Sequence, residues 1–299
     1  MTSIFSDFRG ELAALAAACI WAISSTIYAG FGRQLSPTVL NLTKGAVAIA
    51  FILLTLWLRG EGWAEARLVD VLLLTGSGII GITIGDTAFF SALNCLGARR
   101  ALLMESLAPP LAAILALIFL SEVLSWGAYL GIVLTVMGVA WVVIERTPDT
   151  TQKKLQLKAG IFFGFVAALC QAAGAALSRA ALADTDISPL WSSLIRIVAG
   201  AGCLLVWMMW NRPALQTLDR LRSPKILVII AATAFASTFL AIWLQQTALK
   251  YTATGIAQAL SATSPLFVIP LAAWVGDRIT FRAVLGAIVA LIGIWILFR

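Results

Sequence analysis

Four charged residues lie inside segments that are otherwise apolar and long enough to cross a membrane: Lys44, Asp86, Glu105 and Arg196. A charge near the bilayer centre costs roughly 2.5–3.5 kcal/mol on insertion scales, so each one needs a partner or a function. Counted from the predicted helix ends, the first three share a depth of about 10 Å below one surface. We therefore expect a lysine–carboxylate cluster, which would be a substrate or proton site or a buried ion pair that stabilises a gate.

The elements that must position these residues are apolar segments of about 20 residues, the length of one membrane crossing. The sequence predicts ten such helices, near residues 10–31, 37–58, 68–92, 98–120, 126–145, 158–182, 188–210, 225–248, 253–274 and 280–298. The connection Arg146–Leu157 is polar and lies at the chain midpoint. It divides the chain into two predicted units, residues 1–147 and 158–299.

The two units resemble each other in sequence. The pattern Ser-Pro-x6-Lys at Ser36–Lys44 recurs as Ser-Pro-x6-Arg at Ser188–Arg196, an offset of 152 residues. A second set recurs 155 residues later: Pro110, Glu122 and Gly131 correspond to Pro265, Asp277 and Gly286. A five-helix unit that repeats in tandem must insert its second copy in the opposite orientation. The sequence thus predicts an all-α membrane protein of ten transmembrane helices in two inverted-topology repeats, the usual architecture of a secondary transporter.

Arg196 corresponds to Lys44 in the second repeat, so we expect it at similar depth from the opposite surface. The positions that correspond to Asp86 and Glu105 are Ala241 and Leu260, so no acidic partner repeats there. Arg196 would then contact a substrate or fix the position of its helix. Amide groups would supply neutral polarity on that side of the cavity.

An aromatic residue completes the predicted site. Trp21 lies at mid-depth in the first helix, whereas membrane tryptophans are typical of the interfaces. Such a residue either fills the bundle core or lines a cavity, and Ser24 on the same helix favours a cavity. The candidate substrate-binding residues are Trp21, Ser24, Lys44, Asp86, Glu105, Gln171, Arg196, Trp243, Gln246 and Gln258.

The prolines predict moving parts. Pro109, Pro110, Pro265 and Pro270 interrupt the fourth and ninth helices at corresponding places. A proline frees a backbone carbonyl, which a neighbouring group or a substrate can satisfy. We therefore expect these two helices to move during transport.

Composition excludes several function classes. Hydrophobic residues make up 61% and charged residues 12% of the chain, whereas a soluble domain carries about 25% charged residues. The chain has no histidine, so metal, haem and histidine-based catalysis lose their commonest ligand or base. We predict neither an enzyme nor a cofactor. The formal net charge of +7 lies mostly in short loops, which favours contact with lipid headgroups over nucleic acid.

The sequence does not support nucleotide binding. Gly76–Gly81 fits the pattern GxGxxG, but no strand precedes it and it lies in an apolar span, so close helix packing explains it. The chain has no Walker motif, and we infer that transport is driven by the gradient of the substrate or of an ion.

One segment resembles a known family. Ala108–Gly131, which reads APPLAAILALIFLSEVLSWGAYLG, is similar to the signature of EamA-type carriers of the drug/metabolite transporter superfamily, and Ser264–Gly286 repeats it with Asp277 in place of glutamate. Length and helix pattern are most similar to the YddG-type amino-acid exporters, whose aromatic positions match Trp21 and Trp243. Two tryptophans of that group are replaced here by Ala108 and Gln171. The resemblance implies a multi-pass protein of the cell inner membrane with cytoplasmic termini.

These observations predict an exporter of amino acids or similar small zwitterions. Efflux of lipophilic cations by proton exchange, a permease for phosphorylated metabolites and a structural membrane role stay open. The expected partners are a small-molecule substrate and membrane lipid, and a monomer suffices.

The count of basic residues and the family resemblance predict opposite orientations in the membrane. The side that carries both termini has six loop basic residues against thirteen on the opposite side, and the positive-inside rule makes the richer side cytoplasmic.

Overall fold

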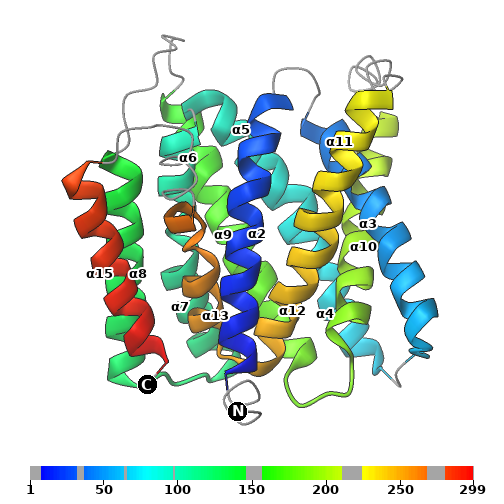
Figure 1. The fold of residues 1–299 in the computed structure, drawn as a ribbon. Helices are drawn as coiled ribbons and strands as arrows, with labels where there is room; N and C mark the ends of the chain where they lie inside the picture. The colour runs from blue at the N-terminus through cyan, green and yellow to red at the C-terminus, as the bar shows by residue number, and fades with distance from the viewer. Residues whose placement is uncertain are drawn as a thin grey trace.

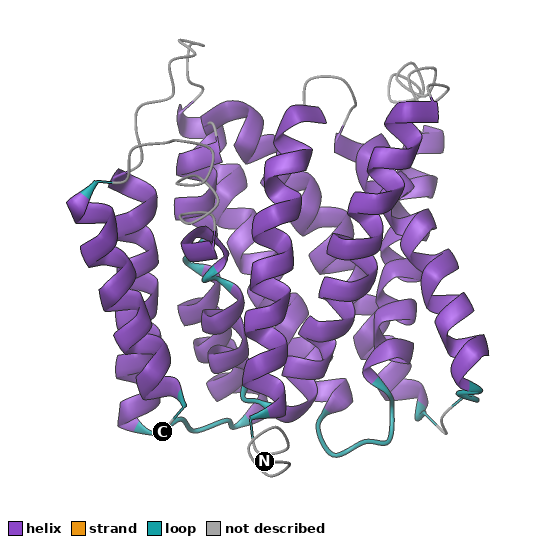
Figure 2. Cartoon of the chain, viewed as in Figure 1, coloured by secondary structure: helices purple, strands orange, loops and turns teal. Residues whose placement is uncertain are grey.

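The computed structural model describes residues 8–31, 37–63, 66–96, 98–145, 157–210, 224–267 and 280–298, and these residues form helices joined by short loops (Figure 2). No strand occurs within those ranges. The helices in chain order are α2 (Arg9–Phe31), α3 (Pro37–Arg59), α4 (Leu68–Gly78), η1 (Ile79–Asp86), α5 (Thr87–Leu96), α6 (Ala98–Glu105), α7 (Ala108–Leu120), α8 (Trp126–Glu145), α9 (Leu157–Leu182), α10 (Pro189–Trp210), α11 (Pro224–Ala234), η3 (Phe235–Leu240), α12 (Ala241–Tyr251), α13 (Thr254–Ser261) and α15 (Phe281–Leu297).

Membrane-spanning helices are confirmed by length and composition. Within the described residues, six helical stretches are long and apolar enough to cross a bilayer: Thr38–Arg59, Leu68–Leu96, Leu103–Leu120, Leu157–Leu182, Pro189–Trp210 and Ile226–Tyr251. Trp126–Val142 and Phe281–Leu297 are shorter apolar helices. The first predicted span corresponds to α2, and the ninth begins with α13. The number of ten crossings stays a prediction.

The helices stand side by side in one bundle, with α8 and α15 paired at one edge (Figure 1). The alanine- and glycine-rich α9 lies in the interior, where it contacts α4, η1, α5, α6, α7, α10, α12 and α13. The start of α2 and the end of α15 lie at the same end of the bundle, and the rings of Phe8 and Phe298 are 5.2 Å apart. We call this end the termini end and the other the opposite end.

Corresponding helices of the two predicted units run antiparallel. In α8 and α15, Gly131 packs against Leu297 and Gly138 against Ala290, so residue numbers rise along one helix as they fall along the other. Backbones approach closely here because glycine has no side chain, as is typical of helix pairs in lipid. In α3 and α10, Gly45 likewise lies beside Ile197 and Ala201.

Both units contain a π-helical segment at the corresponding place. η1 joins α4 to α5, and η3 joins α11 to α12 about one repeat offset later in the chain. A π-helix inserts an extra residue into the turn and is frequent at functional sites. The two segments lie in the third helix of each predicted unit.

Both units also contain an interrupted helix. α6 ends at Glu105 and α7 begins at Ala108, with turn residues Ser106 and Leu107 between them. In the second unit, α13 ends at Ser261 and is followed by turn residues 262–263. The predicted interruption of both helices is therefore confirmed as far as the described residues reach. The break precedes the prolines, because proline is tolerated in the first turn of the next helix.

Several residues used in the sequence argument lie outside the described ranges. They are Ser36, Pro270, Asp277 and residues 146–156 of the predicted linker.

The α8–α15 contact gives a stability prediction. In Gly138→Val the new side chain would overlap the backbone of Ala290 and Gly286, and overpacking of this kind costs about 1–3 kcal/mol. Thermal unfolding of the purified protein in detergent should show a lower midpoint. Gly202→Val is the matched control, since a Cβ at Gly202 meets nothing within 4 Å. Equal midpoints for the two variants would contradict the packing.

Candidate functional site

The depth of Asp86 differs from the sequence prediction. The third helix was expected to end near residue 92, but α5 continues to Leu96. Asp86 therefore lies ten residues from that end, about 15 Å at 1.5 Å per residue. The carboxylate lies near the middle of the 29-residue stretch Leu68–Leu96, deeper than Lys44 and Glu105, for which the estimate of about 10 Å stands.

Asp86 interacts electrostatically with charges from both predicted units. Its Coulombic partners are Lys44 on α3 and Arg196 on α10, and Glu105 at the end of α6 interacts with Asp86 in turn. Arg196 thus interacts with an acidic residue of the first unit, although none repeats at the corresponding positions of the second unit. The repeat analysis compared Arg196 only with corresponding acidic positions, whereas the central position of Asp86 brings it within reach of cations from either side.

Close backbone packing brings Arg196 to η1. A Cβ at Gly78 would overlap the Arg196 carbonyl group, and a Cβ at Gly81 would lie 3.3 Å from Arg196 Nη2. Thr83 Oγ1 donates to Gly200 O at 3.0 Å, one turn further along α10. The glycines of the GxGxxG pattern thus serve helix packing, as predicted, and they place the guanidinium beside the π-helical segment.

Lys44 on α3 faces α5, the helix that follows η1. It is buried, and its Nζ lies 5.3 Å from the centroid of the Phe90 ring. Three residues earlier on α3, the buried Asn41 donates from Nδ2 to Ile82 O at 3.0 Å. Asn41 therefore fixes α3 against η1. The sequence analysis missed Asn41, although its spacing puts it on the same helix face as Lys44.

The amide side chains lie on several different helices. Gln246 on α12 is fully buried, and its Oε1 accepts a hydrogen bond of 2.8 Å from Ser192 Oγ on α10. Gln171 on α9 lies opposite Gly85, next to Asp86 in the chain. Gln258 on α13 is buried near Ser261, and among the described residues neither Gln258 Nε2 nor Ser261 Oγ has a hydrogen-bond partner.

The predicted tryptophans differ in their surroundings. Trp21 Nε1 donates to Ser237 O in η3 at 3.0 Å, so the ring edge of Trp21 is held against the second π-helical segment, and Ser24 is buried on the same helix. Trp243 lies elsewhere: its ring is 6.0 Å from that of Phe239, and the Arg59 guanidinium lies 5.7 Å from its centroid. These contacts belong to an aromatic cluster that packs against α3.

A hydrogen-bonded ion pair connects several segments at the termini end. Arg179 Nε on α9 lies 2.7 Å from Glu122 Oε1, which follows α7. Arg179 Nη1 also donates to the carbonyls of Leu249 and Lys250, and Glu122 Oε2 accepts from the backbone N–H of Thr254. One carboxylate and one guanidinium therefore connect four segments. The sequence showed Glu122 as a repeat position but gave no sign of this partner.

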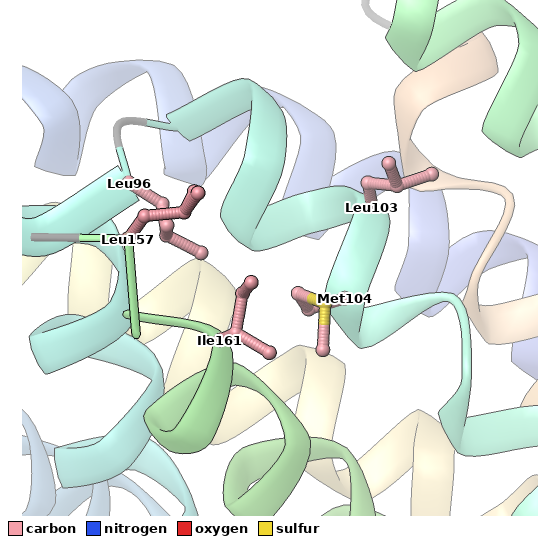
Figure 3. Close-up of a pocket in the computed structure, with 5 residues that line it drawn as sticks. All are labelled: Leu96, Leu103, Met104, Leu157 and Ile161. Carbon is pink, nitrogen blue, oxygen red and sulfur yellow. The ribbon is translucent and has the colours of Figure 1, made fainter. Parts of the chain in front are cut away.

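A pocket of about 230 Å³ opens between α5, α6 and α9. Figure 3 shows its lining side chains, which are Leu96, Leu103, Met104, Leu157 and Ile161. All are apolar, and none is a predicted site residue. Among the residues that the structure describes, no group of three or more acidic or cysteine side chains is arranged to hold a metal ion.

Comparison with known proteins agrees with the architecture. A family model described as EamA-like transporter family matches residues 8–144 and 158–299. A comparison with curated proteins finds no match. A solved structure titled only "Crystal structure of protein" is similar over 96% of both chains with a TM-score of 0.76 and 14% sequence identity, which establishes likeness of fold alone.

The electrostatic interaction of Asp86 with Arg196 predicts energetic coupling. In a double-mutant cycle on unfolding free energy, Asp86→Asn and Arg196→Gln should depart from additivity by about 0.5–3 kcal/mol. Asp86→Asn with Arg179→Gln is the control cycle, because Arg179 pairs with Glu122 at the termini end, and its two effects should add. Additivity in both cycles would show that Asp86 and Arg196 do not interact.

Proposed function

Because the chain belongs to the EamA-like transporter family, we propose that it exports amino acids or similar small zwitterionic metabolites across the inner membrane by alternating access. The family consists of membrane transporters rather than enzymes, and the apolar helices make the chain a multi-pass membrane protein. The substrate, the direction and the inner membrane are the proposed parts. Membership of the YddG-type subgroup is likewise a proposal.

The proposed architecture has ten crossings in two inverted repeats, residues 1–147 and 158–299. Three observations support it: the two separate family matches, the antiparallel contacts between corresponding helices, and the paired π-helical segments. Inverted repeats can exchange conformations, and such an exchange opens a central site first to one side and then to the other. The interrupted helices α6–α7 and α13 are the proposed moving parts.

The substrate class is proposed from the charges of both signs that interact with Asp86. Its carboxylate interacts with Lys44, Arg196 and Glu105 near mid-membrane. A zwitterion needs both signs within the length of one small molecule. In the proposal, Lys44 and Arg196 face the carboxylate of the substrate, and Asp86 and Glu105 face its amine or carry a proton. Trp21 packs the substrate side chain.

The two alternatives fit this charge distribution less well. A lipophilic cation needs a carboxylate and aromatic walls, but here two cationic side chains flank Asp86. A phosphorylated metabolite needs an excess of positive charge, but Asp86 and Glu105 offset Lys44 and Arg196. We also propose cytoplasmic termini, following the family resemblance over the count of basic residues.

The two carboxylates should be needed for transport. Asp86→Asn and Glu105→Gln should each remove most uptake of labelled amino acids into proteoliposomes, with and without a pH gradient. Loss of one buried partner costs up to about 3–5 kcal/mol but leaves packing volume unchanged, so both variants should remain folded. Asp70→Asn is the matched control, since Asp70 pairs with Arg67 at the start of α4. Wild-type uptake in both cluster variants would remove them from the site.

Substitution of Lys44 should affect the transport of zwitterions and of lipophilic cations differently. Lys44→Ala should abolish amino-acid transport, because the substrate carboxylate loses a partner, and leave efflux of a lipophilic cation intact or improved, because a repelling charge is gone. Uptake assays and cation-resistance assays measure the two effects, with the exposed Lys158→Ala as control. Unchanged amino-acid flux together with unchanged cation resistance would make Lys44 a structural residue.

A further inference from the structure

Two buried side chains on facing helices have hydrogen-bond donors that no described residue satisfies. Arg196 is 5% exposed and Gln246 is 0% exposed. Within the described part of the chain, Arg196 Nε and Nη1 and Gln246 Nε2 have no hydrogen-bond partner. Buried donors in native proteins are nearly always paired, so an unpaired set indicates water, an ion or a ligand.

A hydrogen bond from Ser192 connects Gln246 to the helix that carries Arg196. Ser192 Oγ holds Gln246 by its Oε1, which leaves the amide nitrogen of Gln246 as the free end. Ser192 and Arg196 are four residues apart and therefore lie on the same face of α10. Ser192 thus holds Gln246 against the face of α10 that carries Arg196. Gly81 leaves room for the guanidinium, because an added Cβ would lie 3.3 Å from Arg196 Nη2.

We infer that Arg196 and Gln246 form a subsite for the carboxylate group of the substrate. This inference rests on the proposed function and deepens it, because it adds Gln246 to the partners of the substrate carboxylate. An unpaired guanidinium N–H gives a carboxylate a charge-assisted hydrogen bond, and the amide adds a neutral donor. Asp86, a Coulombic partner of Arg196, then faces the substrate amine.

The charge balance favours a carboxylate over a phosphate. Arg196 supplies one positive charge, and Asp86 offsets it. Lys44 reaches Asp86 from α3 rather than α10. A phosphate dianion would be left with excess negative charge in an apolar interior, which is costly. An amino acid brings one charge of each sign and leaves the site neutral.

Ligand-induced thermal stabilisation of the purified full-length protein in detergent tests the subsite without measuring transport. The probes are L-alanine, propionate, L-alaninamide and inorganic phosphate at matched ionic strength. L-alanine should stabilise most, propionate less, and L-alaninamide and phosphate not at all. In Gln246→Leu and Arg196→Lys the apparent Kd for L-alanine and propionate should rise about ten- to a hundredfold, the value of one charge-assisted hydrogen bond.

The matched control is Gln245→Leu, which removes the neighbouring buried glutamine from a different face of α12. It should bind both carboxylate probes as the wild type does. The subsite is overturned if propionate and L-alanine do not stabilise the wild type, if they bind Gln246→Leu unchanged, or if phosphate binds better. Carboxylate binding without amino-acid uptake would support the subsite and refute the proposed function. Amino-acid uptake by the wild type, together with unchanged carboxylate binding by Gln246→Leu, would support the proposed function and refute the subsite.

Discussion

The burial of a carboxylate halfway through the bundle is the constraint on which the rest of the structure depends. Asp86 lies near the middle of a membrane-spanning helix, where an uncompensated charge is expensive. Compensation comes from Lys44 and Arg196, one from each half of the chain. The stability of this charge therefore requires α3 and α10 to meet the third helix of the first half, so the electrostatic requirement and the assembly of the two halves are linked.

Small residues make that meeting possible. Gly78 and Gly81 in the first half and Gly200 in the second allow η1 and α10 to touch along their backbones. Asn41 and Thr83 then fix η1 to α3 and α10 by hydrogen bonds. The π-helical segment ends at Asp86, so these contacts hold the carboxylate at the end of an irregular turn.

Much of the fold could be predicted from the sequence, because long apolar segments and a recurring Ser-Pro-x6-Lys/Arg pattern reflect requirements within single helices. The candidate site was less predictable. The end of α5 was placed four residues early, so the distance of Asp86 from that helix end was underestimated. The Ser192–Gln246 and Glu122–Arg179 contacts join residues 54 and 57 positions apart. Such contacts depend on which helices pack together, and local patterns carry no information about that.

The central claim is that a site with balanced charges, shared by both halves, carries a zwitterion. Its most direct test is counterflow by the wild-type protein in proteoliposomes preloaded with unlabelled amino acids, with a labelled panel outside. The account predicts accumulation of at least one amino acid, and none of the amine or carboxylic acid that lacks one of its charges. Accumulation of a lipophilic cation or a phosphorylated metabolite, with no amino acid exchanged, would contradict it.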